Sequence, residues 1–360
     1  MKKVLVLGAT GSIGKSTLSL IKNMKEEFSA CALVARKNRK KIERLAKEFN
    51  CPFALTTDDN ECIQKLIDKT KPDIVVNGIS GSSGLVPSKI VLENGIDLAL
   101  ANKESVVMAW NLIKKLSKKT GAKIIPVDSE HSAIFNLLNQ IGKKNTEEII
   151  ITASGGPFRA YTKDMLKSVS VKDALHHPTW NMGKKITIDS STLANKGLEI
   201  IEACHLFDFS SQNVKVVLHP ESIVHSLVRT KDGMLYAQMS EPDMTHPIFS
   251  ALTFPEIKKI YLCPFNLFDK NLSFFKPDFN CFPMLSYAYK VIELGGSYSI
   301  AYNASNEVAV HAFLNEKIGF TQIAELTKKT LQKDWTHTPS TFEEVFKINN
   351  LAKEYAESLI

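Results

Sequence analysis

The chain has 360 residues, 44% of them hydrophobic, and 45 basic against 38 acidic side chains give a formal net charge of +7. This length predicts two or three domains with real hydrophobic cores. No Lys/Arg tract is interleaved with aromatic residues, so no nucleic-acid partner is expected. No apolar run approaches the roughly 20 residues that a membrane helix needs, so no membrane partner is expected either.

The six cysteines are scattered and form no CxxC pair, which argues against both a disulfide framework and a zinc knuckle. The apolar run before Gly8 is too short for a signal peptide. We therefore expect a cytoplasmic protein with reduced thiols. The excess of positive charge suits an anionic ligand, although a solvated basic surface explains it as well.

Residues 1–127 alternate short apolar runs with segments of helical spacing, such as Lys41–Phe49 and Glu61–Asp68. This alternation predicts an α/β domain with a doubly wound, Rossmann-like parallel sheet that is covered on both faces. The expected strands are Lys3–Leu7, Ala30–Ala35, Phe53–Thr56, Asp73–Val76, Asp97–Leu100 and Lys123–Val127.

Residues 128–255 mix both periodicities and predict a central α+β domain. Residues 256–283 are rich in Phe, Pro and Asn and are expected to be a connecting arm, and residues 284–360 are expected to form a C-terminal helical bundle. The expected central strands are Glu148–Thr152, Lys185–Ile188, Val214–Leu218 and Leu235–Met239, and the central helices His131–Ile141 and Lys196–Phe207. The expected C-terminal helices include Met284–Leu294, Ser305–Asn315, Phe320–Leu331 and Thr341–Leu359.

The first strand runs into a glycine-rich turn with the spacing G-x-x-G-x-x-G, at Gly8, Gly11 and Gly14. Gly8 allows the tight turn, Gly11 lets the backbone approach a pyrophosphate, and Gly14 lets the next helix pack close to the strand. A phosphate would then meet the N–H groups at the start of that helix. The spacing departs from the usual G-x-G-x-x-G, but the position favours dinucleotide binding.

The end of the second strand reads Ala-Arg36-Lys37-Asn38-Arg39, where an acidic residue would bind the ribose of NAD. Cations suit a 2′-phosphate, so NADP is favoured, with a solvated basic loop as the alternative. Lys103 follows the fifth strand, where it can contact a substrate oxygen or simply pair with Glu104.

Asp128 and Glu130 follow the sixth strand, and in an extended segment they would point the same way. Two converging carboxylates suit a hard divalent cation such as Mg²⁺ or Mn²⁺, although an Asp-x-Glu pattern is also common by chance. A third ligand would come from Glu199 or Glu202, between which the spacing does not choose.

Several short polar motifs in the central region could bind a phosphate. Ser154 precedes two adjacent glycines, and Ser190-Ser-Thr with Asn195-Lys196 adds hydroxyl, amide and cationic donors. A plain helix N-cap explains one such hydroxyl but not the cluster. Trp180 lies in a loop that fits either a mobile flap or a satellite core contact.

In their order, the motifs GATGSIG, NKES, PVDSEHSAIF, SGGPFR, HPTWNMGKKITIDSSTLANKGLE, HPESIVHS and EPDM resemble the 1-deoxy-D-xylulose 5-phosphate reductoisomerase family over nearly the whole chain. The resemblance implies an NADPH-binding domain, a catalytic domain, an arm and a helical bundle in a homodimer. It also implies rearrangement and reduction of 1-deoxy-D-xylulose 5-phosphate (DXP) to 2-C-methyl-D-erythritol 4-phosphate in the non-mevalonate isoprenoid pathway, with NADPH and Mg²⁺ or Mn²⁺.

The resemblance also assigns residues. It implies a metal site on Asp128, Glu130 and Glu199 and catalytic roles for Lys103, Glu130 and His177. It implies substrate contacts at Lys103, Ser129, Glu130, Ser154, His177, Trp180, Ser190, Asn195, Lys196 and Glu199, with a flap over residues 177–183. It implies nucleotide contacts at Thr10, Gly11, Ser12, Ile13, Arg36, Lys37, Asn38, Asn102, Glu104 and Gly183, although Arg36 stands where many relatives are expected to have a small residue.

Two other functions fit parts of the pattern. A semialdehyde dehydrogenase can open with a similar glycine turn but needs a nucleophilic cysteine, and Cys204 lies in an apolar helix. A non-catalytic NADP-binding sensor would not need three metal carboxylates. His219 and His225 are each expected to be satisfied structural histidines unless a ligand contact is found.

Overall fold

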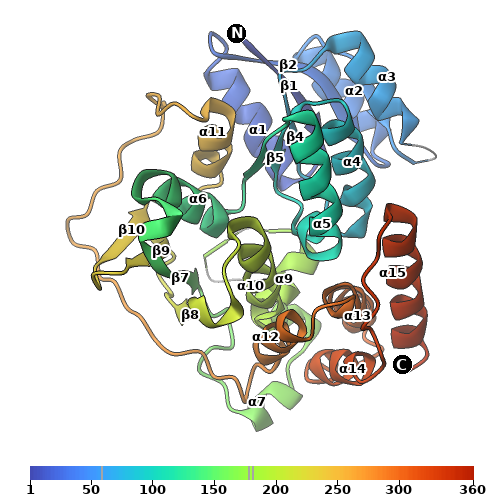
Figure 1. Cartoon of the computed structure of the whole chain (residues 1–360), viewed down its shortest axis with the longest axis vertical. Helices are drawn as coiled ribbons and strands as arrows, with labels where there is room; N and C mark the ends of the chain where they lie inside the picture. Colours follow the sequence, from blue (N-terminus) through green and yellow to red (C-terminus); the bar gives the residue numbers. More distant parts are fainter. Residues whose placement is uncertain (58–59, 177–178, 181) are drawn as a thin grey trace. The chain divides into compact units, whose positions relative to one another are not determined.

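The computed structural model describes residues 1–57, 60–176, 179–180 and 182–360. The chain forms two compact units, each assembled from separated segments (Figure 1). Unit 1 comprises Met1–Ser105, Trp110–Ser132 and Asp243–Pro264, and unit 2 comprises Val106–Ala109, Ala133–Pro242 and Phe265–Ile360. No helix in the described part of the chain is long and apolar enough to cross a bilayer.

Unit 1 is built on a six-stranded parallel sheet with the strand order β3-β2-β1-β4-β5-β6. The strands are β1 (Lys2–Leu7), β2 (Phe28–Ala35), β3 (Phe53–Leu55), β4 (Ile74–Asn77), β5 (Asp97–Leu100) and β6 (Ile124–Pro126). The helices between them are α1 (Ser12–Asn23), α2 (Arg39–Glu48), α3 (Glu61–Thr70), α4 (Leu85–Glu93) and α5 (Lys103–Thr120). The predicted doubly wound sheet is confirmed. Its strands are continuous apolar runs because helices cover both faces, as the full burial of residues 4–7 and 74–76 illustrates.

One helix returns to unit 1 from much later in the sequence. Helix α11 (Thr245–Thr253), which we did not predict, lies beside α1 (Figure 1). The Lys2 Nζ atom donates to the Leu252 carbonyl at 2.8 Å, and the rings of Phe28 and Phe249 meet edge to face. These contacts attach helix α11 to the rest of unit 1.

Unit 2 contains a mixed four-stranded sheet with the order β10-β9-β7-β8. Strands β7 (Thr146–Ala153) and β8 (Val214–Leu218) are parallel to each other. Strand β9 (Val224–Thr230) pairs antiparallel with β7, and β10 (Leu235–Met239) pairs antiparallel with β9. The accompanying helices are α6 (Ser129–Ile141, which begins in unit 1), α7 (Lys163–Lys167), α8 (Val171–Ala174), α9 (Lys184–Ser191) and α10 (Ala194–Phe207). Strand β9 was missed in the prediction.

The strand predicted at Lys185–Ile188 is wrong, because these residues form most of helix α9. The Ile-Thr-Ile run favours a strand locally, but Thr187 and Ile188 are buried, and α9 contacts helices α8, α10 and α13 (Tyr298–Leu314). The Thr187 hydroxyl donates to the Gly183 carbonyl at 2.9 Å, one turn earlier on the helix. Tertiary packing therefore overrides the local preference.

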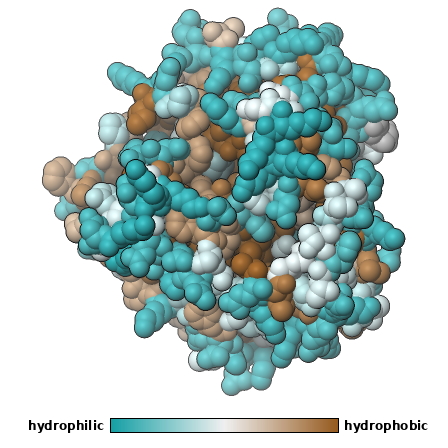
Figure 2. All heavy atoms as spheres, viewed as in Figure 1, coloured by the Kyte–Doolittle hydropathy of each residue, from teal (hydrophilic) through white to brown (hydrophobic). Residues whose placement is uncertain are grey.

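The C-terminal region is helical, as predicted. It contains α12 (Met284–Leu294), α13 (Tyr298–Leu314), α14 (Gln322–Leu331) and α15 (Phe342–Glu357). Between α11 and α12, residues 256–283 contain no helix or strand, and a single bridge joins Phe275 to Leu218 at the end of β8. Polar side chains cover most of the face in Figure 2, with tan and brown ones at the left edge, where β10 and the arm lie in Figure 1.

Candidate active site

The glycine-rich turn links β1 to α1 and is shaped by steric limits at its first and last glycines. Gly8 has φ +77°, and a Cβ atom there would lie 2.7 Å from the Gly78 carbonyl oxygen. A Cβ atom at Gly14 would lie 2.4 Å from the Gly8 carbonyl oxygen, so α1 packs directly on the turn. Gly11 has only the Gly8 oxygen nearby, at 3.3 Å, and precedes a helix that no side chain caps. The backbone of Thr10–Ile13 therefore has the form of an anion-binding turn.

The basic loop after β2 is tied to this turn by a residue that sequence reasoning missed. Asn38 caps α2, its side chain accepting from the Lys41 backbone N–H at 3.1 Å, while Arg36 and Lys37 are exposed. The Lys41 ammonium crosses to the Thr10 carbonyl at 2.6 Å. Burial and the neighbouring Lys15 ammonium lower the pKa of Lys41. Two cations thus meet beside the glycine turn, which sequence spacing alone did not reveal.

Asn102 and Glu104 lie where β5 ends and α5 begins, and both are buried. The Asn102 side chain accepts from the Ser105 N–H at 3.0 Å and so caps α5. Its amide nitrogen donates to the carbonyls of Ile79 and Gly81 and to the Glu104 carboxylate, all at 2.8–2.9 Å. Asn102 therefore fixes the loops after β4 and β5 against each other, at the edge of the sheet where a nucleotide is expected.

Lys103 pairs with Asp128, and because Lys103 and Glu104 are both buried, the alternative of a surface pair is wrong. The Lys103 ammonium contacts Asp128 Oδ2, and these side chains are only 8% and 11% exposed. The ends of the neighbouring strands β5 and β6 bring them together. A buried lysine-carboxylate pair at the carboxyl edge of a parallel sheet is typical of a functional site.

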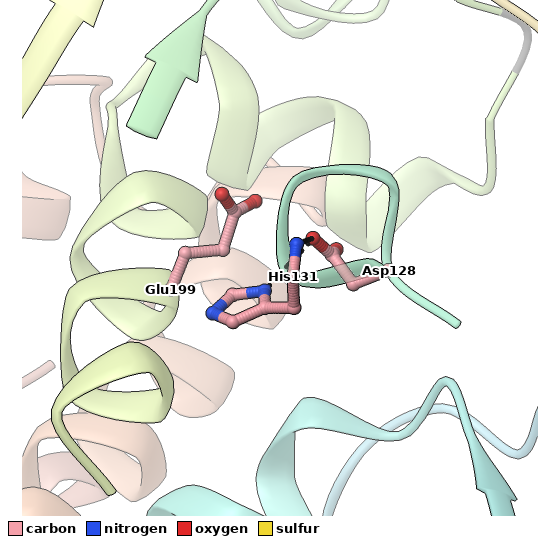
Figure 3. A group of neighbouring side chains, drawn as sticks. All are labelled: Asp128, His131 and Glu199. Carbon is pink, nitrogen blue, oxygen red and sulfur yellow. Dashed lines mark hydrogen bonds and ion pairs between the residues drawn. The ribbon is translucent and has the colours of Figure 1, made fainter. Parts of the chain in front are cut away.

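The expected extended geometry of Asp128 and Glu130 is also wrong, because α6 begins at Ser129. Asp128 Oδ1 accepts the backbone N–H groups of Glu130 and His131 at 3.1 and 3.3 Å, as a helix cap does. The same oxygen lies 2.9 Å from Nδ1 of the fully buried His131 (Figure 3). The Ser129 hydroxyl donates to the Glu130 carboxylate. His131 was not among the predicted site residues, although its i,i+3 spacing from a capping Asp could have indicated it.

In unit 2, the loop of Ser154, Gly155 and Gly156 approaches the end of α9. Both glycines have positive φ, +81° and +64°. A Cβ atom at Gly156 would lie 3.0 Å from Ser191 Cα and 3.1 Å from the Ser190 carbonyl oxygen. The Gly156 N–H donates to the Ser154 hydroxyl at 3.3 Å. Two predicted phosphate contacts, on Ser154 and Ser190, thus come from segments in direct contact.

Helix α10 starts directly after α9 and carries the remaining polar residues of this segment. The Lys196 ammonium and the Asn195 amide each contact one oxygen of Glu199 at 2.6 Å. Lys196 and Glu199 are buried, and the Asn195 Oδ1 atom is buried without a hydrogen-bond partner. Glu199 lies on helix α10 (Figure 3), and its carboxylate is held by Asn195 and Lys196 in the first turn of that helix. Glu202, the other candidate ligand, is one turn further on and is also buried.

Part of the predicted flap lies outside the described residues. His177, the expected catalytic histidine, lies outside the described residues, and so do Pro178 and Asn181. Trp180 is half-buried. Gly183 directly precedes α9, and a Cβ atom at this position would have no described atom within 4 Å. The described residues of 176–183 form neither helix nor strand.

The two histidines of the HPESIVHS motif have structural partners. His219 is fully buried, its Nε2 atom accepts the N–H groups of Ile223 and Val224 at 3.2 and 3.1 Å, and its ring stacks on Phe274. His225 Nε2 lies 2.7 Å from the Ser240 hydroxyl. Both contacts agree with the structural interpretation.

Cys204, the one cysteine considered as a nucleophile, is poorly suited to that role. It lies in the hydrophobic core of unit 2 and is 8% exposed. Burial raises the pKa of its thiol to about 12. A nucleophilic cysteine needs thiolate character near neutral pH, so the geometry disfavours thiol catalysis at this position.

Comparisons with known proteins agree with these features. Family models match residues 4–69 and 55–110 (1-deoxy-D-xylulose 5-phosphate reductoisomerase), 124–207 (the C-terminal domain of that enzyme) and 239–355 (DXP reductoisomerase C-terminal domain). Curated 1-deoxy-D-xylulose 5-phosphate reductoisomerases from Treponema denticola and Treponema pallidum are 46% and 43% identical. The alignments cover 99% and 100% of this chain and 96% and 98% of theirs.

Solved structures give the same result. A DOX-P reductoisomerase in complex with NADPH, fosmidomycin and magnesium is 35% identical, with a TM-score of 0.89 over 99% of this chain and 98% of that one. The Zymomonas mobilis 1-deoxy-D-xylulose 5-phosphate reductoisomerase in complex with NADPH is 36% identical, with the same TM-score and coverage. The chain therefore belongs to the 1-deoxy-D-xylulose 5-phosphate reductoisomerase family.

Proposed function

We propose that this protein converts DXP to 2-C-methyl-D-erythritol 4-phosphate with NADPH and a divalent metal ion, as a step of isoprenoid synthesis. The observation that carries the proposal is a pair of buried lysine-carboxylate contacts, Lys103 with Asp128 and Lys196 with Glu199, in a chain of this family. A structural role alone does not explain two such pairs, because desolvating an ion pair is costly.

The cofactor would bind unit 1. The backbone of Thr10–Ile13 would receive the pyrophosphate, and the cations around Arg36, Lys37 and Lys41 would receive the 2′-phosphate. Asn102 holds the loops that would border the nicotinamide. Glu104 and Gly183 are kept as proposed nucleotide contacts on the strength of the resemblance.

The donor set fits a hard divalent cation. Asp128, Glu130 and Glu199 would supply carboxylate oxygens, which Mg²⁺ and Mn²⁺ prefer. Within its own unit, each of Asp128 and Glu199 is oriented by a hydrogen bond from the start of its own helix. Such an ion would act as a Lewis acid on the ketone and a neighbouring hydroxyl oxygen of the substrate.

The protein's own groups would handle protons, orientation and water. Lys103 and Glu130 are proposed to orient the substrate oxygens and move protons to and from them while one carbon–carbon bond breaks and another forms. NADPH would then transfer a hydride to the aldehyde carbon, and the aldehyde oxygen would take up a proton. His177 and Trp180 are proposed to cover the substrate and exclude water, and Ser129 to hold Glu130.

The phosphate of the substrate is proposed to bind unit 2. Ser154, Ser190, Asn195 and Lys196 offer hydroxyl, amide and ammonium donors on segments that contact one another. Because the phosphate does not react, its binding energy would serve to position the reacting carbons.

A homodimer is also proposed. Strand β10 forms an edge of the unit 2 sheet, and Leu235, Tyr236 and Met239 are 47%, 45% and 37% exposed. An apolar edge strand favours pairing with a second copy. Light scattering on the purified protein should give twice the chain mass of 40.1 kDa, and a monomer mass would contradict the proposal.

We retain the division into a 1–127 NADPH-binding domain, a 128–255 catalytic domain, a 256–283 arm and a 284–360 helical domain as a proposal. A cytoplasmic location is proposed because the six cysteines are scattered along the sequence and include no CxxC pair. The dehydrogenase alternative is disfavoured by Cys204, and a non-catalytic sensor would leave the buried lysine-carboxylate pairs without a role.

The direct test follows NADPH absorbance in the presence of DXP, with and without Mg²⁺. The proposal predicts consumption of NADPH that needs both DXP and the metal, with 2-C-methyl-D-erythritol 4-phosphate as product. NADPH oxidation that proceeds equally well without Mg²⁺, or no NADPH oxidation when DXP and Mg²⁺ are both present, would contradict the proposal.

A further inference from the structure

Helix α13 contacts both ends of the segment that carries three of the proposed phosphate contacts. That segment runs from Ser190, at the end of α9, to Lys196, in the first turn of α10. On the α9 side, the Asn306 amide donates to Asp189 Oδ1 at 2.8 Å. On the α10 side, the Tyr302 hydroxyl lies 3.5 Å from the Ala194 carbonyl oxygen.

Asp189 is the unusual member of this group, because its carboxylate is almost fully buried immediately before Ser190. Its two oxygens are shared between α9 and α13, since Lys185 pairs with Oδ2 at 2.8 Å and Asn306 with Oδ1. Burial is the main cause that raises the pKa of the Tyr302 hydroxyl, and the negative charge of Asp189 raises it further. A buried carboxylate beside a phosphate site would repel the phosphate unless its charge is balanced.

Asn306 is fully buried, and its amide oxygen has no hydrogen-bond partner. Burying an unpaired amide oxygen costs free energy that an apolar residue of the same shape would avoid. The contact with Asp189 is the only side-chain hydrogen bond of Asn306 among the described residues. The residue therefore fits a role in fixing Asp189 better than a role in core packing.

Tyr302 lies one turn before Asn306 on the same face of α13. A Cβ atom at Gly197 would lie 2.3 Å from its hydroxyl oxygen, so the glycine of Asn-Lys-Gly allows this ring to reach the start of α10. The hydroxyl also donates to the Met284 carbonyl at 3.2 Å. The two side chains of α13 thus hold the polar segment from both ends.

We propose that Asn306 is a positioning residue for substrate binding: through Asp189 it holds Ser190 and the turn to Asn195 and Lys196 in the geometry that receives a phosphate. This inference rests on the proposed function and extends it to a helix that would not touch the substrate. It predicts that α13 sets the affinity of the site for a phosphate group.

The test compares Asn306→Leu with Asn349→Leu. Asn349 is a matched control, because it is also a buried helical asparagine with an unpaired amide oxygen, and it bonds neither α9 nor α10. Calorimetric titration with inorganic phosphate, which needs no turnover, should give about a tenfold higher Kd for Asn306→Leu, the size expected from losing one hydrogen bond to a charged group. The KM for DXP should rise with it, while the Kd for NADPH stays at the wild-type value.

Asn349→Leu should leave all three constants unchanged, whatever it does to the melting temperature. Lys185→Met removes the half-exposed partner of the same carboxylate and should raise the phosphate Kd to a smaller extent, so the idea stays testable if Asn306→Leu does not fold. Wild-type phosphate affinity in a folded Asn306→Leu protein, or an equal loss in Asn349→Leu, would overturn the proposal. A wild-type protein that binds phosphate but does not turn over DXP would instead count against the proposed function.

Discussion

Replacing Gly197 by alanine should damage unit 2 severely, for a reason that the geometry makes quantitative. The new Cβ atom would lie 2.3 Å from the Tyr302 hydroxyl oxygen, 3.1 Å from Ala288 Cβ and 3.2 Å from Tyr302 Cζ. Tyr302 is fully buried, so relieving this overlap requires a shift of its ring or of the α10 backbone within the core. Overpacking costs roughly 1–3 kcal/mol, and losing the hydroxyl bond to Met284 leaves a buried polar group that costs about 1–3 kcal/mol more.

We therefore expect Gly197→Ala to lower the stability of unit 2 by about 2–6 kcal/mol. In a unit of this size that corresponds to a fall of roughly 10 °C in the apparent melting temperature, measured by tryptophan fluorescence. The double variant Gly197→Ala with Tyr302→Phe removes the oxygen at 2.3 Å and leaves contacts of 3.1 Å and above. It should melt higher than Gly197→Ala alone, although Tyr302→Phe by itself lowers stability. Wild-type melting of Gly197→Ala, or strictly additive effects in the double variant, would refute the steric argument.

Three further outcomes follow from the site. Glu199→Gln should abolish DXP turnover at saturating Mg²⁺ while NADPH binds as before, whereas normal activity would remove Glu199 from the metal set. Lys41→Met should weaken binding of adenosine 2′,5′-bisphosphate by about tenfold and leave ADP binding unchanged, with exposed Lys40→Met as the control; equal losses for both nucleotides would indicate a purely structural contact with the turn. Because burial raises the pKa of the Cys204 thiol to about 12, its thiolate fraction grows only as the pH rises toward that value. Iodoacetamide near neutral pH should therefore leave Cys204 unmodified by mass spectrometry, and rapid labelling with loss of activity would reopen thiol catalysis.

The parallel sheet of unit 1 could be predicted because its strands are short apolar runs between helical segments, and both features are local. The edge at which we propose a ligand to bind was predicted from the same pattern, since the carboxyl ends of the strands carry Gly8, Arg36 and Lys103. The partner of Lys103 could not be chosen by proximity in sequence. Glu104 is adjacent in sequence, but the pair with Asp128 forms because the neighbouring strands β5 and β6 bring the two side chains together.

Helix α9 shows where local reasoning fails. Its Ile-Thr-Ile run favours a strand, yet Asp189 in the same helix is bonded to Asn306, 117 residues away. The start of α6 was misplaced because the capping role of Asp128 was not considered, although an Asp before a helical run is a common N-cap. The contact between Lys41 and Thr10 depends on the relative placement of two loops, which no periodicity encodes.

A crystal grown with NADPH and soaked in manganese offers the sharpest examination of the catalytic account. Anomalous diffraction should reveal one strong peak bounded by carboxylate oxygens of Asp128, Glu130 and Glu199. A map with density for the nucleotide but no anomalous signal beside those three side chains would contradict metal-assisted chemistry at this site.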